Sequence, residues 1–340
     1  MPITRDFGNP FSVVDYTKEV NIIPNTWGTI NSLNIFEDEP VAEQTVTFQE
    51  VSKDFGIILD RVRGDRANQN KDYSRKLHTF AVPHFPLDDQ ILPKDLQGKS
   101  AYTNLSEADT LDAVRMRKME RIRASHAATL EKARAQLLTA GTVYAPNGTV
   151  SQNWFTEMGV AQTVVGFDLS TSTTDVVAKV EAAIAAIQDN AGVISMSGIV
   201  ALCSPTFFSA LISHANVKQA FTYYSSTQEP LRQRLSAGGS VTAMHREFFY
   251  CGVRFIEMRD NLGGQLITAN EAVFVPTGTD VFRTYFAPAE RFGLVNTLGE
   301  QVYMFETPAA NGTAIQIETE SNFVNACMKP KLIVRATIAA

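Results

Sequence analysis

The sequence predicts an α+β fold, and three patterns along the 340-residue chain support this prediction. Residues 106–140 carry apolar side chains at helical spacing without an internal Gly or Pro, which predicts one long helix. Residues 174–213 alternate helix, strand and helix, and strand-like runs dominate from residue 247 onward. Helices and strands that occupy separate stretches of a chain in this way are typical of α+β domains.

Residues 1–43 lack a clear apolar period and are predicted to form an extended arm. Four prolines punctuate them, and aromatic residues are scattered between the prolines. Such an arm has no core of its own, so it gains stability only by lying on its own body or on a neighbour. Residues 1–6 mix charge with proline and no apolar run follows them, so a signal peptide is not expected.

Residues 44–100 are predicted to form a hairpin that projects from the body. Strand-like runs at 45–48, 55–59 and 77–82 flank the polar stretch 61–76. That stretch contains six basic and two acidic side chains. Loops of this length are usually functional or disordered, and an ordinary solvated loop is the alternative.

The helix predicted at 106–140 has clear boundary signals. Ser106 and Asp109 resemble a capping box, and Gly141 supplies the stop. At 1.5 Å per residue the helix would be about 50 Å long, which exceeds the width of a small core. We therefore expect it to run along the outer edge of the molecule.

Five basic side chains crowd this helix, and they form a candidate contact strip. They are Arg115, Arg117, Lys118, Arg121 and Arg123. The functional interpretation is contact with an acidic neighbour or with DNA phosphates. The alternative is a solvated helix face with carboxylates nearby.

The remaining elements follow from turn and capping signals. Asn147-Gly148 predicts a tight hairpin, and Ser204 with Pro205 predicts the start of a helix after an apolar strand at 198–203. Asn311-Gly312 predicts a second tight turn. The strands expected in the last third of the chain are 248–258, 266–275, 281–286, 302–305, 314–319 and 331–338.

The composition fits a folded chain with a sizeable core of one large domain or two closely joined ones. Apolar residues make up 44% and charged residues 19%. The net charge of −6 argues against a dedicated nucleic-acid binder but leaves non-specific contact with DNA open. The uncharged stretch 190–213 is broken by Ser, Gly and Pro, so no membrane span is expected. Three widely spaced cysteines favour a reducing cytoplasm.

The sequence contains no recognisable catalytic, cofactor-binding or metal-binding pattern. No P-loop, Gly-x-Gly-x-x-Gly, Gly-x-Ser-x-Gly or His-Glu-x-x-His motif occurs, and the five histidines lie far apart. We therefore expect a protein that is not an enzyme and uses no cofactor.

Four segments in order resemble the lambda-type major capsid protein E family of tailed bacteriophages. They are Phe207–His214 with Val217-Lys218, Tyr250–Glu257, Pro276–Thr279 followed by Phe282–Ala289, and Glu320–Asn322 with Lys329-Pro330 and Leu332–Val334. The order and spacing of these segments fit the family over residues 30–338.

The resemblance implies a Hong Kong 97-like capsid fold. It would make 1–43 the N-terminal arm, 44–100 the E-loop, 101–165 a P-domain with the spine helix 106–140, 166–290 the A-domain, and 291–340 returning strands of the P-domain or the A-domain. The E-loop tip would contact a neighbouring subunit. Its candidate contact residues are Arg61, Arg63, Asp65, Arg66, Lys71, Asp72, Arg75 and Lys76.

The function implied by the resemblance is self-assembly into pentamers and hexamers of an icosahedral shell that encloses double-stranded DNA. The implied partners are further copies of the chain, a scaffolding protein and a portal protein, with a decoration protein as a further candidate and no membrane. The implied location is the virion capsid, with assembly in the host cytoplasm. The alternatives are a cellular compartment protein of the same fold and an α/β enzyme centred on 166–290. The enzyme would need a Gly-rich loop where Ser204-Pro205-Thr206 stands.

Overall fold

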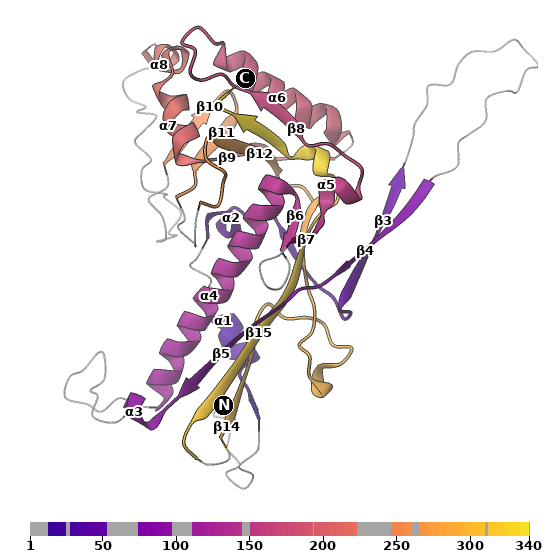
Figure 1. The fold of residues 1–340 in the computed structure, drawn as a ribbon, viewed down its shortest axis with the longest axis vertical. Coiled ribbons are helices and arrows are strands. Elements are labelled where there is room, and N and C mark those ends of the chain that lie inside the picture. Colours follow the sequence, from indigo (N-terminus) through magenta and orange to yellow (C-terminus); the bar gives the residue numbers. More distant parts are fainter. Residues whose placement is uncertain are drawn as a thin grey trace, which may run out of the picture.

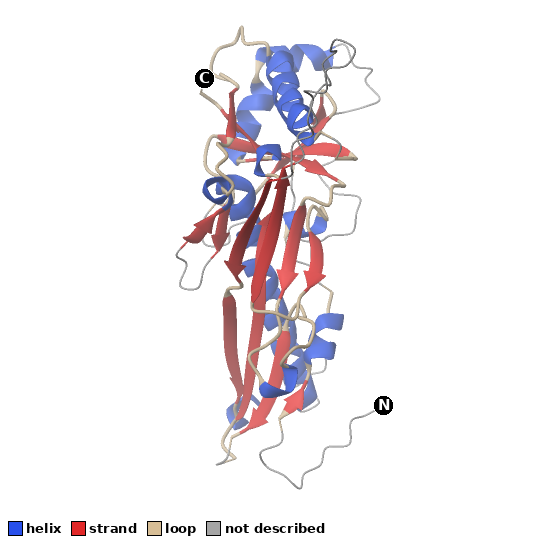
Figure 2. Ribbon diagram, turned by 90° about the vertical axis from the view of Figure 1, so that its right-hand side faces the viewer, coloured by secondary structure: helices blue, strands red, loops and turns tan. Residues whose placement is uncertain are grey.

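The computed structural model describes residues 13–24, 28–52, 74–96, 111–144, 150–192, 194–222, 246–259, 265–309 and 312–339. In these ranges one six-stranded sheet runs along the length of the molecule, and a second six-stranded sheet lies across its upper end (Figure 2). A two-stranded hairpin projects to one side (Figure 1). This mixture of long antiparallel strands and separate helices confirms the expected α+β class.

The long predicted helix is present as α4, Leu111–Ala140, and residues 106–110 lie outside the described ranges. It ends where predicted, because Gly141 has a φ of +66° that other residues adopt with strain. The apolar side chains Val114, Met119 and Ile122 are buried between α4 and the long sheet. The opposite face is exposed in the first half of α4, which lies along the side of the molecule (Figure 1), whereas residues 126–139 are buried or half-buried.

The long sheet is built around one strand, β15, which spans Ile315–Cys327. Its first half pairs with β14 (Tyr303–Pro308) on one side and β5 (His84–Ile91) on the other, both antiparallel. Its second half pairs with β13 (Phe282–Phe286), and β2 (Glu37–Pro40) pairs with β13. The short β1 (Val14–Asp15) pairs with β14. Because β15 is shared by every part, it fixes the two ends of the sheet relative to each other.

Short helices fasten the beginning of the chain to this body. They are α1 (Thr17–Ile22) and α2 (Thr29–Ser32); another short helix, α3 (Pro93–Leu96), follows β5. Val20 of α1 is fully buried in the cluster beneath α4, and Ile30 of α2 is fully buried in the main core. The described part of the predicted arm therefore lies on its own body.

The upper sheet has the strand order β10-β11-β9-β12-β16-β8. These strands are Glu247–Tyr250, Val253–Glu257, Gly198–Cys203, Glu271–Thr277, Val334–Thr337 and Thr163–Gly166, respectively. The helices α6 (Val176–Ala191), α7 (Pro205–Ser213) and α8 (Ala215–Thr222) complete this region. The predicted cap is present, since Ser204 Oγ accepts from the Phe207 N–H at 3.3 Å.

The predicted hairpin appears as β3 (Thr45–Ser52) paired antiparallel with β4 (Ser74–Ala81). Phe48 and Phe80 anchor its base against the fully buried Trp154, with ring centroids 5.2 and 4.2 Å from the indole. Above this anchor the two strands leave the body (Figure 1). The stretch 53–73, with most of the predicted contact residues of the tip, lies outside the described ranges.

A second small hairpin follows α4. It consists of β6 (Thr142–Tyr144) and β7 (Val150–Asn153), and the predicted Asn147-Gly148 turn lies outside the described ranges. The one-turn helix α5 (Trp154–Glu157) then begins at Asn153, whose side chain accepts from the Phe155 and Thr156 N–H groups. The 3-10 turns η2 (Phe292–Leu294) and η3 (Pro330–Leu332) complete the described elements.

Several strand boundaries differ from the predicted ones. The run 248–258 is two antiparallel strands, because Cys251 and Gly252 both adopt positive φ and make a turn. Strand β12 begins only at Glu271, and β15 continues eight residues beyond Thr319 to Cys327. The pairing also places β13 in the long sheet, although the sequence grouped it with 166–290. Conversely, β8 belongs to the upper sheet, although the sequence grouped most of it with 101–165, and the returning strand β16 pairs with it there.

Candidate functional site

The predicted basic strip on α4 is divided between the interior and the surface. Arg115 is 5% exposed, and its Nε and Nη2 donate to the two carboxylate oxygens of Glu306 at 2.6 and 2.8 Å. Arg123 is also buried, and its Nη2 donates to Gln301 Oε1 at 2.6 Å. Neither guanidinium is therefore available to bind an acidic neighbour or a DNA phosphate.

The other three members of the strip lie nearer the surface. Lys118 Nζ donates to Asp89 Oδ1 at 2.8 Å and to the Gln90 carbonyl at 2.9 Å. Arg117 and Arg121 lie on the exposed face of α4. The structure thus buries two of the five predicted contact residues, pairs Lys118 with Asp89, and places Arg117 and Arg121 on the surface.

Burial acts to lower the pKa of Arg115 and of Arg123, and nearby groups compensate for it to different degrees. For Arg115 desolvation is the largest influence and lowers the pKa, but the hydrogen bonds and charge of Glu306 outweigh it, so the pKa is raised. For Arg123 burial dominates and lowers the pKa, and Asp38 compensates only in part. The burial of Arg115 could have been predicted from the sequence. Arg115 lies four residues before the buried Met119 and therefore on the same face of the helix.

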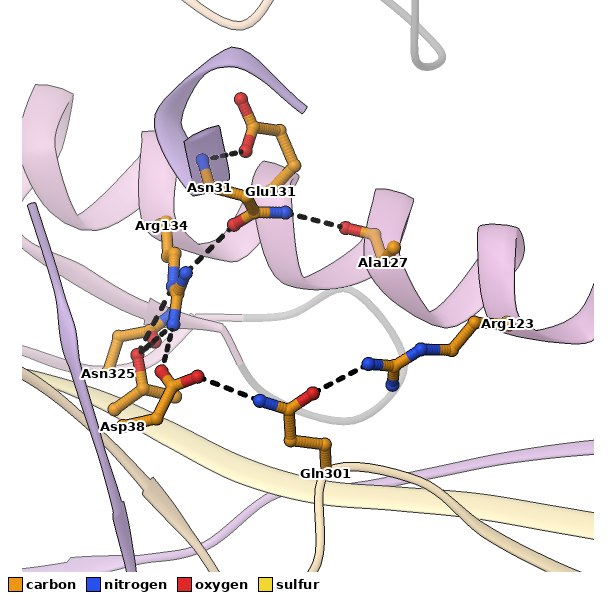
Figure 3. Close-up of polar contacts among 9 residues, drawn as sticks. Asn31, Asp38, Arg123, Ala127, Glu131, Arg134, Gln301 and Asn325 are labelled. Carbon is orange, nitrogen blue, oxygen red and sulfur yellow. Dashed lines mark hydrogen bonds and ion pairs between the residues drawn. The ribbon is translucent and has the colours of Figure 1, made fainter. Parts of the chain in front are cut away.

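Sequence reasoning missed a polar cluster that lies beneath α4 and joins described segments far apart in the chain (Figure 3). We call it the polar network; it comprises Asn31, Asp38, Arg123, Ala127, Glu131, Arg134, Thr284, Gln301 and Asn325. These residues come from α2, β2, α4, β13, β15 and the segment before β14. It therefore ties the start of the chain to the helix and the long sheet.

Arg134 is the centre of the polar network. Its side chain is 5% exposed and forms an ion pair with Asp38. Nη1 donates to Asn31 Oδ1 at 2.9 Å, and Nη2 donates to Thr284 Oγ1 at 2.9 Å. Desolvation by burial lowers the pKa of this guanidinium despite the nearby carboxylates. Because its partners belong to α2, β2 and β13, Arg134 holds these elements in position against α4.

Glu131 performs the capping role for α2. Its carboxylate accepts the Ile30 N–H at 2.7 Å and the Asn31 N–H at 2.9 Å. The residue before α2 is Gly28, which has no side chain to cap the helix. A Cβ at Gly28 would lie 2.4 Å from Glu131 Oε2, so the glycine makes room for this carboxylate. The cap thus comes from a residue 101 positions away from Ile30.

His126 is buried on the same helix. Its Nε2 lies 3.0 Å from Thr319 Oγ1 of β15. Burial, and next the charge of Arg123, lower its pKa to about 4. The imidazole is therefore neutral at physiological pH and links α4 to the central strand as an uncharged hydrogen-bonding group.

The face of the long sheet opposite α4 carries a groove of about 830 Å³. Ile317 and Met304 point toward the helix, and their neighbours Glu318 and Phe305 line the groove, as strand alternation requires. We call it the acidic groove, because five carboxylates line it: Asp15, Asp88, Glu290, Glu318 and Glu320. Arg291, which pairs with Glu318, is the one lysine or arginine among its lining residues.

The segment that contains η2 lines part of the acidic groove and exposes apolar side chains. Phe292 is fully exposed at 103%, and Val295 and Leu298 are 62% and 63% exposed. The base of this segment is fixed, since Leu294 packs on the buried Tyr303 and Phe305. Exposed apolar side chains gathered on one fixed segment are typical of an interaction surface.

Within the described ranges, no group of three or more His, Cys, Asp or Glu side chains is arranged to hold a metal ion. No helix in this part of the chain is long and apolar enough to cross a membrane. The groups that the structure does bring together are the buried polar network and the two surfaces, the exposed side of α4 and the acidic groove.

Comparison with known proteins gives a consistent result. The family described as phage major capsid protein E matches residues 12–338. The major capsid protein of Pseudomonas phage KPP10 is 44% identical over 345 residues, which covers 97% of this chain and 98% of that protein. The major capsid protein of Salmonella phage Felix O1 is 26% identical and covers 98% of this chain and 97% of its own length.

Solved structures resemble the chain in fold. A phage-related protein from Bordetella bronchiseptica matches with a TM-score of 0.54 at 14% identity, over 95% of this chain and 96% of that one. The bacteriophage PhiM1 mature capsid matches with a TM-score of 0.52 at 11% identity, over 92% and 87% of the two chains. At these identities the likeness concerns the fold alone, and it confirms the expected Hong Kong 97-like capsid architecture.

Proposed function

The chain belongs to the phage major capsid protein E family and is a major capsid protein, and from this premise we propose that its copies form pentamers and hexamers of an icosahedral shell around packaged double-stranded DNA. The observation that carries the proposal is the full-length relationship to a major capsid protein at 44% identity. The role is geometric, so we propose no catalytic activity.

The projecting hairpin supports an assembly role. Among the side chains of β3 and β4 that the structure describes, Val46, Phe48 and Phe80 at the base are buried against the body, whereas Leu77 is 71% exposed. An isolated two-stranded hairpin is marginally stable in water, and a neighbouring subunit would supply the missing surface. Closed symmetry then repeats each weak contact many times, which stabilises the whole shell.

We assign the capsid domains as the sequence suggested, with the strand pairing used to refine them. The arm is 1–43, the E-loop lies within 44–100, and the spine helix is α4 in a P-domain that contains the long sheet. The A-domain lies within 166–290 and includes the upper sheet, which β8 and β16 complete from outside that range. Strand β13 is grouped with the P-domain, because it pairs with β15.

The partners that we propose beyond further copies are a scaffolding protein, a portal protein and a decoration protein. Contact with packaged DNA would be non-specific and weak, since a container with a net charge of −6 does not hold DNA tightly. The protein would reach the virion capsid after assembly in the host cytoplasm.

Electron microscopy of the purified protein, expressed with and without its scaffolding partner, tests the proposal. The expected particles are closed and show local fivefold and sixfold symmetry when the scaffold is present. Nuclease-resistant DNA in particles from infected cells would support the packaging role over an empty compartment. A protein that remains monomeric at high concentration under both conditions would refute the shell.

A further inference from the structure

The segment 292–298, which contains η2, gathers exposed apolar side chains. Ten large apolar side chains are exposed in the described ranges, and three of them, Phe292, Val295 and Leu298, lie within this one segment. The other seven are scattered along the chain from Val13 to Phe249. Single exposed apolar residues are ordinary, but a group of them on one segment indicates a surface that a partner covers.

Backbone and side-chain contacts hold this segment in one conformation. The Thr297 hydroxyl donates to the Leu294 carbonyl at 2.7 Å, and the Gly299 N–H donates to the Val41 carbonyl at 3.0 Å. A Cβ at Gly299 would overlap the carbonyl oxygen of Phe286 in β13, so the segment lies directly against the long sheet. A surface that is fixed before the partner arrives loses little conformational entropy on binding.

The segment carries no charge, which restricts the partners that it can bind. Residues 292–299 contain no Lys, Arg, His, Asp or Glu, and Arg291 before them pairs with Glu318. DNA phosphates are bound by cationic side chains, so the segment is not suited to DNA. A strongly charged peptide would find no opposite charge on these residues. The chemistry therefore fits a partner that presents an apolar surface.

A second copy of the same segment meets this requirement. A contact across a twofold axis places one patch against itself, so any charge on the patch would face the same charge. A charge-free apolar patch is self-complementary. A shell of pentamers and hexamers contains local twofold axes between neighbouring capsomers. We propose that the segments 292–298 of two neighbouring subunits pack against each other across such an axis. This inference rests on the proposed shell function.

Cysteine cross-linking tests whether identical positions meet. In particles of Val295→Cys, mild oxidation should form a disulfide between two subunits, and most of the protein should run as a dimer in non-reducing gel electrophoresis. Val177→Cys replaces another exposed valine, in α6, and is the matched control that should remain monomeric. The wild type sets the background, since its Cys203 and Cys327 are buried.

Charge substitution at the same position gives an independent measure. Val295→Asp or Val295→Lys alone would place like charges opposite each other, and each should lower the fraction of subunits in closed particles about tenfold. A mixture of the two variants brings opposite charges together and should restore assembly. Val295 is 62% exposed, so the melting temperature of the subunit should not change. Val295→Ile keeps the contact apolar and should assemble as the wild type does.

The outcomes separate this inference from the shell proposal. If the wild type forms no particles, the shell proposal fails and the self-contact fails with it. If particles form but Val295→Cys gives no more dimer than its controls, the inference fails alone. If both charged variants are defective and their mixture does not recover, the segment contacts a different surface of a neighbour or a different protein, which also overturns the self-contact.

Discussion

Replacing Glu131 with Gln should release the beginning of the chain from α4. The carboxylate accepts N–H donors from Ile30 and Asn31 at 2.7 and 2.9 Å, and the side chain is fully buried. Gln has nearly the same shape, but one of its two terminal atoms is itself a donor. It can therefore accept only one of the two N–H groups and must turn an N–H toward the other.

The expected magnitude follows from these two bonds. A hydrogen bond to a charged group contributes about 1.5–3 kcal/mol, and an unsatisfied buried N–H costs about 1–3 kcal/mol. We expect Glu131→Gln to lower the free energy of unfolding by about 2–3 kcal/mol, out of a typical total of about 5–15 kcal/mol. If the loss is local, opening of residues 28–36 becomes about 30 to 150 times more frequent.

Hydrogen–deuterium exchange with peptides that cover 28–36 measures this opening, and urea denaturation measures the global change. Glu120→Gln on the same helix is the control, because Glu120 is exposed. Faster exchange confined to 28–36 in the Glu131 variant is the expected result. Unchanged exchange in that segment would show that the carboxylate does not cap α2.

Three further predictions concern the same elements. Ala128→Pro in the middle of α4 should cost about 3 kcal/mol or more, measured by denaturation; normal stability and normal particles would contradict a continuous helix. His126 has a folded pKa of about 4, below the ordinary value of 6.5, so its stabilising contribution is complete above pH 6.5 and is lost as the pH falls toward 4. His126→Gln should flatten this pH dependence by up to about 3 kcal/mol, and an unchanged slope in acid denaturation would assign it to other groups. Deleting residues 61–73 should leave circular dichroism and melting unchanged but prevent proper shells; loss of the fold would place the segment in the core.

Local signals predicted the elements that depend on neighbours in sequence. Gly141 ends α4, and Ser204 with Pro205 starts α7, because these residues act within one turn of the helix. The hairpin strands β3 and β4 followed from their strand-like runs on either side of a polar stretch. The family resemblance then supplied the capsid fold, which comparison with solved structures confirmed.

The contacts that pattern reasoning missed all join distant parts of the chain. Arg115 meets Glu306 across 191 residues, and Glu131 meets Ile30 across 101, so no window of sequence contains both partners. The arginines of α4 were therefore interpreted as a surface strip, although two of them are buried. The turn at Cys251-Gly252 was not predicted. The strands on both sides of it are apolar and largely buried, so the sequence reads as one continuous strand.

The way β4 continues into β5 has a mechanical consequence. Only Val82 and Pro83 separate the hairpin from β5, whose eight residues pair in register with β15 from Ile91 to His84. The bonds of an antiparallel ladder lie perpendicular to the strands. A pull on the hairpin along β5 therefore loads these bonds together in shear, rather than opening them one after another as in a zipper. Tension between neighbouring molecules would pass through this ladder into β15, and the packing of Phe48 and Phe80 on Trp154 would hold the base of the hairpin in place.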